Sequence, residues 1–166
     1  MTESALEFNR LLRRVQEWKD RGLTIALCHG CFDPLHVGHV DHLEQASTFC
    51  DRLVVTVTAD RFVNKGPRRP FVTAADRVRV VAAIRFVDGA AINPWPVAYD
   101  TLQALKPNIF VKGSDYNGDV VSEGFQAELE VASRFGIEIR YTNTTKRSAT
   151  ELVNLMERDD ASAIGD

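Results

Sequence analysis

The sequence has few cysteines, no long apolar run and no large excess of either charge. Its 166 residues include three cysteines, and 20 lysines and arginines stand against 23 acids, for a net charge of -3. Proteins that bind nucleic acid broadly usually carry a basic excess, so this balance argues against that class. No apolar stretch approaches the roughly 20 residues that cross a bilayer, so no membrane span is expected.

The cysteines and the first residues bear on the cellular compartment. Cys28, Cys31 and Cys50 are an odd number of thiols, which favours free cysteines over a disulfide framework. Residues 1–22 carry acids early and contain no uninterrupted apolar segment, so they do not resemble a signal peptide. We therefore expect a cytoplasmic protein.

The length suits one domain that can bury its own core. Phe8, Leu11 and Val15 recur at helical spacing, and Gly22 stands where a helix C-cap belongs, so an N-terminal helix is expected within 1–22. We expect a single domain over 1–157 and a flexible tail over 158–166, where the residues are acidic and small.

Beyond residue 22, short β-branched or apolar runs alternate with helical patterns. Strands are expected at Leu23–Cys28, Arg52–Thr58, Val87–Ile92, Ile109–Lys112 and Ile137–Tyr141. Helices are expected at Val37–Phe49, Ala74–Ile84, Thr101–Leu105 and Glu123–Phe135. This alternation predicts an α/β fold, a Rossmann-like parallel sheet of about five strands with helices on both faces, and ligands beyond the C-terminal strand ends.

All four histidines lie within fourteen residues, directly after the first expected strand. His36 and His39 are three residues apart at the opening of a helix, and Gly38 between them lets backbone approach a ligand. A helix N-terminus favours an anion, and imidazoles can donate hydrogen bonds to phosphoryl oxygens as charge builds in the transition state. The pattern indicates a phosphate site suited to in-line displacement at phosphorus.

The segment Gly30–His39 resembles the GxFDxxHxGH signature of the cytidylyltransferase-like nucleotidyltransferases. This resemblance implies that His36 and His39 contact a triphosphate and stabilise the pentacovalent transition state. It also implies that the neighbouring residues shape the nucleotide pocket, with Asp33 near the nucleotide or the acceptor. The expected pocket residues are Gly30, Cys31, Phe32, Asp33 and Gly38.

A basic loop follows the second expected strand. Lys65, in Asn64-Lys65-Gly66, matches the position of a phosphate-binding lysine in this superfamily and completes the expected catalytic set. Residues 61–75 contain no acid, which creates a local positive field suited to a phosphorylated acceptor. The acceptor-binding candidates are Arg61, Arg68, Arg69 and Arg77. Each of these arginines could instead be a solvated cation or a partner in a surface ion pair.

Two further segments extend the resemblance. Residues 111–116 resemble the VKGxDY segment of the nucleotidyltransferase that makes ADP-heptose more than the MGxDW form of glycerol-3-phosphate cytidylyltransferases. Residues 147–152 resemble the ISTTxI element, in which hydroxyls and a helix N-terminus hold the β- and γ-phosphates, although Ala149 and Asn143 depart from the family pattern. Further nucleotide contacts are thereby implied for Lys112, Gly113, Asp115, Tyr116, Arg147, Ser148 and Thr150.

Together these resemblances imply an enzyme that transfers a nucleoside monophosphate from an NTP, with ATP favoured, to a phosphorylated acceptor such as a sugar 1-phosphate. Pyrophosphate would leave, and Mg²⁺ would be held by the triphosphate rather than by a set of protein ligands. The expected partners are the NTP and the small acceptor, without nucleic acid or membrane, and the family resemblance implies a homodimer.

Alternatives remain open from sequence. One is a CTP-dependent cytidylyltransferase acting on glycerol 3-phosphate, another polyol phosphate, phosphocholine or a phosphonate. Another is a nucleotide-binding protein without catalysis. A zinc or redox site using Cys28 and Cys31 is a third, although the two residues between His36 and His39 fit structural zinc poorly. Trp95 could stack on a ligand or pack within its loop.

Overall fold

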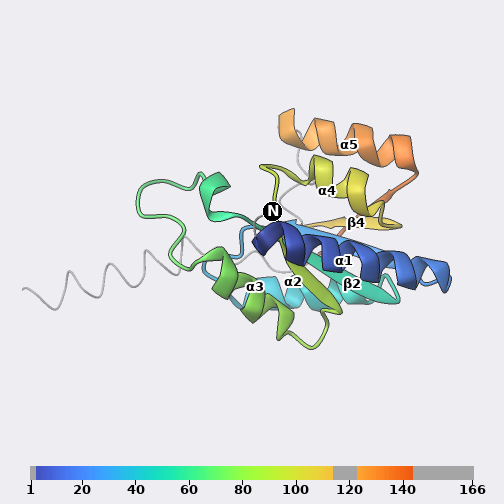
Figure 1. The fold of residues 1–166 in the computed structure, drawn as a ribbon, viewed down its shortest axis with the longest axis horizontal. Coiled ribbons are helices and arrows are strands. Elements are labelled where there is room, and N and C mark those ends of the chain that lie inside the picture. The colour runs from blue at the N-terminus through green and yellow to red at the C-terminus, as the bar shows by residue number, and fades with distance from the viewer. Residues whose placement is uncertain (1–2, 114–122, 144–166) are drawn as a thin grey trace, which may run out of the picture.

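The computed structural model describes residues 3–113 and 123–143 (Figure 1). Its helices are α1 (Glu3–Asp20), α2 (Val37–Ser47), α3 (Ala74–Ala82), α4 (Ala98–Leu105) and α5 (Glu123–Phe135). Its strands are β1 (Ile25–Gly30), β2 (Arg52–Thr58), β3 (Gly89–Asn93), β4 (Ile109–Lys112) and β5 (Glu138–Tyr141). One short 3₁₀ helix, η1 (Asp60–Phe62), follows β2.

The five strands form one parallel sheet in the order β3-β2-β1-β4-β5, which confirms the expected α/β fold. The chain adds strands first on one side of β1 and then on the other, so the order reverses between β1 and β4. In such sheets the crevice for a ligand opens at this reversal, beyond the C-terminal ends of the strands. Gly30 and Lys112 are the last residues of the two strands that flank it.

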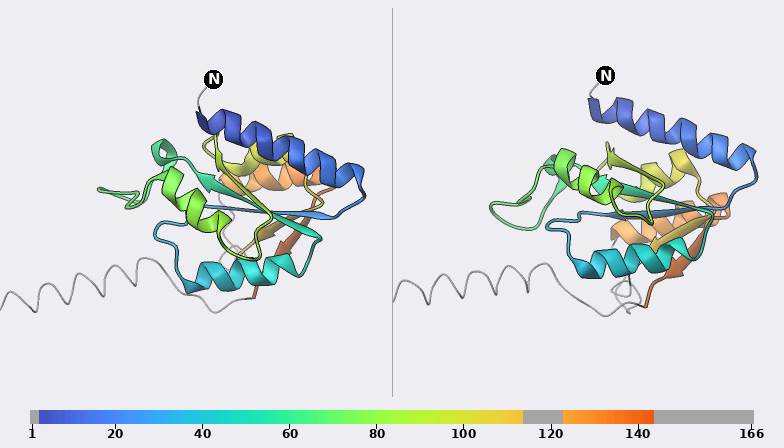
Figure 2. Two further views of the ribbon diagram at one scale, coloured as in Figure 1. Left: turned by 60° about the horizontal axis from the view of Figure 1, so that its bottom comes forward. Right: turned by 90° about the horizontal axis from the view of Figure 1, so that it is seen from below.

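Helices cover both faces of the sheet, and Figure 2 shows α1 and α2 on opposite sides of it. On one face, apolar side chains of α1, α4 and α5 pack with Leu27 and Phe110 of the sheet. On the other face, side chains of α2 and α3 pack with Cys28 and Val111. Because successive strand residues point to opposite faces, neighbouring residues of β1 and β4 contribute to different cores.

The N-terminal helix is packed closely onto the edge strand β3. A Cβ built on Gly89, the first residue of β3, would lie 2.7 Å from Cδ1 of Leu11 and 3.7 Å from the Trp18 ring. Only glycine therefore allows α1 to lie this near the strand. Gly22 ends the helical turn with φ of 76°, as expected for a C-terminal glycine.

Several predicted boundaries were wrong, and pairing between strands explains two of them. β1 begins at Ile25 and runs to Gly30, later than the expected Leu23–Cys28, because Gly30 still pairs with Val57. β3 likewise begins at Gly89, where pairing with Val54 starts. α4 begins at Ala98, three residues before the helix expected from Thr101, and η1 occupies a stretch in which only a loop was expected.

Within residues 3–113 and 123–143, none of the helices has the length and apolar character to cross a membrane.

Candidate functional site

His36 and His39 lie together at the N-terminus of α2. His36 is the N-cap residue, and the centroids of the two imidazole rings are 3.8 Å apart. Nδ1 of His39 accepts a hydrogen bond from the backbone N–H of His36 at 3.2 Å. Because Nδ1 is an acceptor, the proton of the neutral His39 ring is on Nε2, which leaves a donor for a ligand.

The environment keeps both imidazoles neutral. Burial lowers the pKa of His39 to about 3, with further contributions from the charges of His36, Lys65 and His42. Burial also lowers the pKa of His36, as does the charge of Lys65. Nδ1 of His36 is buried and has no hydrogen-bond partner among the described residues. The pair therefore offers neutral N–H donors at the positive end of a helix.

Lys65 is brought to this site from the segment between η1 and α3, which projects from the body of the protein in Figure 1. Its side chain is exposed, and its charge acts on His36, His39 and Cys31. The structure thus brings His36 and His39 together and sets both within reach of the Lys65 charge. An ammonium beside two imidazole donors is a suitable environment for phosphate oxygens.

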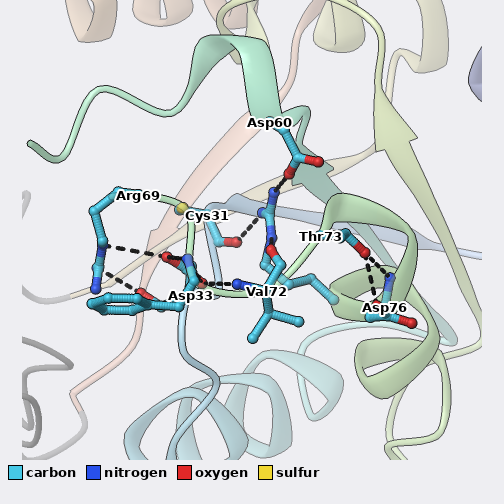
Figure 3. A network of polar contacts seen from close by, with 9 residues as sticks. Cys31, Asp33, Asp60, Arg69, Val72, Thr73 and Asp76 are labelled. Atoms are coloured by element: carbon cyan, nitrogen blue, oxygen red, sulfur yellow. Dashed lines mark hydrogen bonds and ion pairs between the residues drawn. The ribbon is translucent and has the colours of Figure 1, made fainter. Parts of the chain in front are cut away.

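The Asp33 side chain is not directed into the ligand crevice, because its carboxylate is bound inside the protein (Figure 3). Asp33 is 1% exposed, and its carboxylate accepts backbone N–H bonds from Phe71, at 2.9 and 3.0 Å, and Val72, at 3.0 Å. Arg69 adds an ion pair at 3.3 Å and donates to the Asp33 backbone carbonyl at 2.7 Å. Both predicted site residues join the β1–α2 loop to the segment before α3.

Arg77 is also engaged inside the protein. Its guanidinium is 1% exposed and donates to the backbone carbonyls of Val72 and Cys31, and it forms an ion pair with Asp60. These three acceptors come from three separate segments of the chain. An acceptor-binding role, as the sequence analysis suggested, would require Arg77 to exchange some of these contacts.

The other two predicted acceptor-binding arginines lie nearer the surface. Arg61 donates to the backbone carbonyl of Pro94 at 2.8 Å, and its guanidinium lies 4.5 Å from the centroid of the Phe62 ring. Arg68 is exposed and has a positive φ of 62°. Pro94 belongs to the loop after β3, so Arg61 connects the ends of two neighbouring strands.

Lys112 ends β4 and is paired with Glu128 of α5. The two side chains are 7% and 8% exposed, and Nζ of Lys112 donates to the Glu128 carboxylate at 2.7 Å. Gly113 follows directly, and a Cβ built on it would meet no atom within 4 Å. A ligand can therefore approach the backbone closely at the end of β4.

Two further histidines, His29 and His42, make polar contacts near the C-terminal ends of the strands. Nδ1 of His29 lies 3.0 Å from the Thr56 hydroxyl of β2, and burial lowers the His29 pKa to about 4. Nδ1 of His42 lies 2.7 Å from the hydroxyl of Thr142, and burial lowers its pKa to about 4 as well. His29 thus connects β1 to β2, and His42 connects α2 to the residue that follows β5.

The pocket neighbours in the β1–α2 loop are tightly packed. Phe32 is 4% exposed with φ of 52°, and its ring centroid lies 5.1 Å from that of His39. A Cβ built on Gly30 would lie 3.2 Å from the Phe32 ring. Gly38 lies inside the first turn of α2. Gly30 and Phe32 thus shape the wall on which His39 rests.

The geometry does not favour the zinc or redox alternative. Cys28 is fully buried in the core under α2 and α3, and burial raises the pKa of its thiol. His29, the next strand residue, points to the opposite face. Residues 3–113 and 123–143 hold no group of three or more histidine, cysteine or acidic side chains arranged to bind a metal.

Trp95 packs against the N-terminal helix, with its ring 5.1 Å from that of Phe8 in an edge-to-face arrangement. Some predicted nucleotide contacts lie outside the described residues: Asp115, Tyr116, Arg147, Ser148 and Thr150.

Sequence reasoning missed the internal partners of the site: Thr56, Asp60, Glu128 and Thr142. Only Thr56 could have been suspected from the sequence, because a polar residue within a buried parallel strand needs a hydrogen-bond partner.

Comparison with known proteins shows a match between residues 27–158 and the family model described as cytidylyltransferase-like. The curated protein named Bifunctional protein HldE from Methylobacillus flagellatus is 40% identical over 128 residues, which cover 76% of this chain and 26% of that protein. HldE from Koribacter versatilis is 42% identical over 123 residues, covering 72% of this chain and 25% of that protein. The chain thus spans about a quarter of the length of these relatives.

Among solved structures, a lipopolysaccharide core biosynthesis protein from Thermoplasma volcanium is similar in fold. It has a TM-score of 0.60 and 24% identity over 76% of this chain and 99% of that one. A pantoate-beta-alanine ligase from Francisella tularensis has a TM-score of 0.56 and 14% identity, over 82% of this chain and 66% of that one. At these identities the likeness shows the shared fold.

Proposed function

Since the chain belongs to the cytidylyltransferase-like family of nucleotidyltransferases, we propose that it transfers a nucleoside monophosphate from ATP to a sugar 1-phosphate and releases pyrophosphate. The observation that supports this proposal is the pair of neutral imidazoles, His36 and His39, at the N-terminus of α2, within reach of the Lys65 charge. The choice of ATP and a sugar phosphate is supported by the resemblance of residues 111–116 and by the similarity to HldE.

The proposed reaction is a single displacement. An oxygen of the acceptor's phosphate forms a bond to the α-phosphorus, while the bond from that phosphorus to the oxygen bridging to the β-phosphate breaks, and pyrophosphate leaves. The phosphate acceptor is largely ionised near neutral pH, so no side chain has to remove a proton from it. The protein's task is therefore to position the groups and stabilise charge.

His39 would donate from Nε2 to a phosphoryl oxygen whose charge rises in the transition state. Its lowered pKa keeps the ring neutral at physiological pH, so Nδ1 can accept from the His36 N–H while Nε2–H donates to the ligand. Lys65 would place its positive charge beside the leaving pyrophosphate. Gly113, with open space at its Cα, would allow the nucleotide to lie against the end of β4.

A divalent cation requirement accompanies this family, and we assign Mg²⁺ to the triphosphate. The side chains at the helix N-terminus are imidazoles, and the carboxylate of the preceding loop, Asp33, is already bound by backbone N–H groups. This donor set suits phosphate oxygens, whereas Mg²⁺ prefers oxygen ligands, so the phosphates would be its main ligands. Bound there, the cation would neutralise part of the phosphate charge.

We also propose a homodimer in the cytoplasm, following the family resemblance and the three free thiols.

The test is pyrophosphate release with Mg²⁺ and each of ATP, CTP, GTP and UTP, against sugar 1-phosphates, glycerol 3-phosphate, phosphocholine and small phosphonates. The His39→Ala variant, purified identically, controls for contaminating activity. Turnover with ATP and a sugar 1-phosphate supports the proposal. Turnover with CTP and a polyol phosphate would assign the protein to the alternative cytidylyltransferase reaction, and NTP binding without turnover on any acceptor would favour a binding protein.

A further inference from the structure

The segment that carries Lys65, residues 60–72, is held against the β1–α2 loop at both of its ends. We use the name clasp for the contacts of two buried residues, Asp33 and Arg77, with this segment. At one end Arg77 binds the carboxylate of Asp60 in η1, and at the other Asp33 accepts the backbone N–H groups of Phe71 and Val72. Lys65 lies between these two anchors.

The clasp also includes the loop that leads into α2. Arg77 donates to the backbone carbonyl of Cys31, and Asp33 itself belongs to that loop. Figure 3 shows these contacts converging between the two segments. Both groups are charged and almost fully buried, and removing one partner from such a network leaves the other groups unpaired. The relative position of the two segments is therefore sharply defined.

Lys65, in contrast, is exposed and has no ion-pair partner within residues 3–113 and 123–143. Its charge lowers the pKa of His36 and of His39, and its distance from them depends on where the backbone of its segment is held. A flexible lysine side chain loses rotamer entropy when it binds phosphate, so the position of its backbone decides how often it reaches the site.

We propose that Asp33 and Arg77 are positioning residues of the transfer reaction, which act through the clasp to hold the segment that carries Lys65 beside the loop that leads to His36 and His39. This inference rests on the proposed function for its kinetic consequences, but the geometry it describes can be tested without turnover. It assigns to Asp33 and Arg77 a role different from direct contact with nucleotide or acceptor.

The first experiment measures the His36 pKa by NMR titration in the unliganded protein, where only four histidines contribute signals. The Lys65 charge lowers this pKa, so Lys65→Ala should raise it. If the clasp holds Lys65 in place, Asp33→Asn and Arg77→Lys should also raise it, and neither should raise it further in the Lys65→Ala background. A His36 pKa that stays at the wild-type value in both folded clasp variants would overturn the proposal.

Asp88→Asn is the matched control. Like Asp33, Asp88 accepts a backbone N–H, from Leu53 at 2.9 Å, and pairs with an arginine, Arg52. It lies directly before β3, at the N-terminal ends of the strands and away from the site at their C-terminal ends, so its loss should leave the His36 pKa unchanged. An equal rise in this control would show that general loosening moves the His36 pKa, which would also overturn the proposal.

The second experiment is a double-mutant cycle on kcat. Asp33→Asn should lower kcat about tenfold in the wild-type background and less than about twofold in the Lys65→Ala background, because its effect passes through Lys65. An equal loss in both backgrounds would contradict the clasp. If Lys65→Ala alone left kcat unchanged, the catalytic role of Lys65 would fail, while the titration would still decide the geometry.

Discussion

The backbone N–H of His36 donates to Nδ1 of His39, which fixes the orientation of the second imidazole at the start of α2. The two rings are 3.8 Å apart and inclined by 34°. A hydrogen bond from the N-cap backbone thus sets both the tautomer and the direction of His39. His39, which the motif spacing identifies in the sequence, is therefore oriented by the backbone at the N-terminus of α2.

Replacing His39 with alanine should lower kcat at least about a hundredfold with little change in the KM for the NTP. The reason is that Nε2–H would be lost as a donor to charge that develops only in the transition state. Steady-state pyrophosphate release measures this, and circular dichroism checks the fold. Unchanged turnover would remove His39 from the catalytic set.

The buried histidines should make the protein less stable in mild acid. The pKa values of His29 and His42 are lowered to about 4 and that of His39 to about 3, whereas unfolded imidazoles take up protons below about pH 6.5. Between about pH 6.5 and 4 the unfolded state therefore binds more protons, so the free energy of unfolding falls as the pH falls. Each such histidine contributes up to about 1.4 kcal/mol per pH unit.

Urea unfolding at pH 7, 6 and 5 measures this slope. In the His42→Gln variant the free energy of unfolding should depend less steeply on pH, because one of the histidines that titrate only in the unfolded state is gone. A slope equal to that of the wild type would mean that His42 is not held neutral in the folded protein.

The sequence was sufficient for the order of elements and for the histidine pair, because both depend on local patterns. Runs such as Arg52–Thr58 alternate with amphipathic segments, and that alternation allows few arrangements other than a parallel sheet. His36 and His39 are marked by a spacing that a helix places on one face. Such features need no knowledge of tertiary contacts.

The partners of the charged residues could not be predicted, because they come from distant segments. Asp33 contacts residues 38 and 39 positions later, and Arg77 reaches back 46 positions to Cys31. In sequence, Arg77 and Arg69 are simply cations in a basic region. Only the contacts that Arg69 and Arg77 make with Asp33 and Cys31 of the β1–α2 loop show that these arginines turn inward.

The buried Lys112–Glu128 pair gives a test that separates stability from binding. Glu128→Gln should lower the free energy of unfolding by about 3–5 kcal/mol, because it leaves the Lys112 charge without its buried carboxylate. The double variant Lys112→Met, Glu128→Leu should restore most of that loss, since apolar side chains of similar size can fill the space.

Kinetics on the same double variant test the predicted nucleotide contact of Lys112. A raised KM for the NTP at restored stability supports that contact. An unchanged KM would leave Lys112 as a structural residue joining β4 to α5.

The close packing of α1 on β3 predicts that Gly89→Ala is destabilising. The new Cβ would lie 2.7 Å from Cδ1 of Leu11, and relief would require a shift of α1 or of the Leu11 side chain, at about 1–3 kcal/mol. Gly124→Ala is the control, because its Cβ would have its nearest contact at 4.0 Å, from Val97. Chemical unfolding of both variants measures the difference.

In a Leu11→Ala background the cost of Gly89→Ala should drop by at least about half, since the colliding atom is gone. An undiminished cost there would mean that contact with Leu11 is not what requires the glycine.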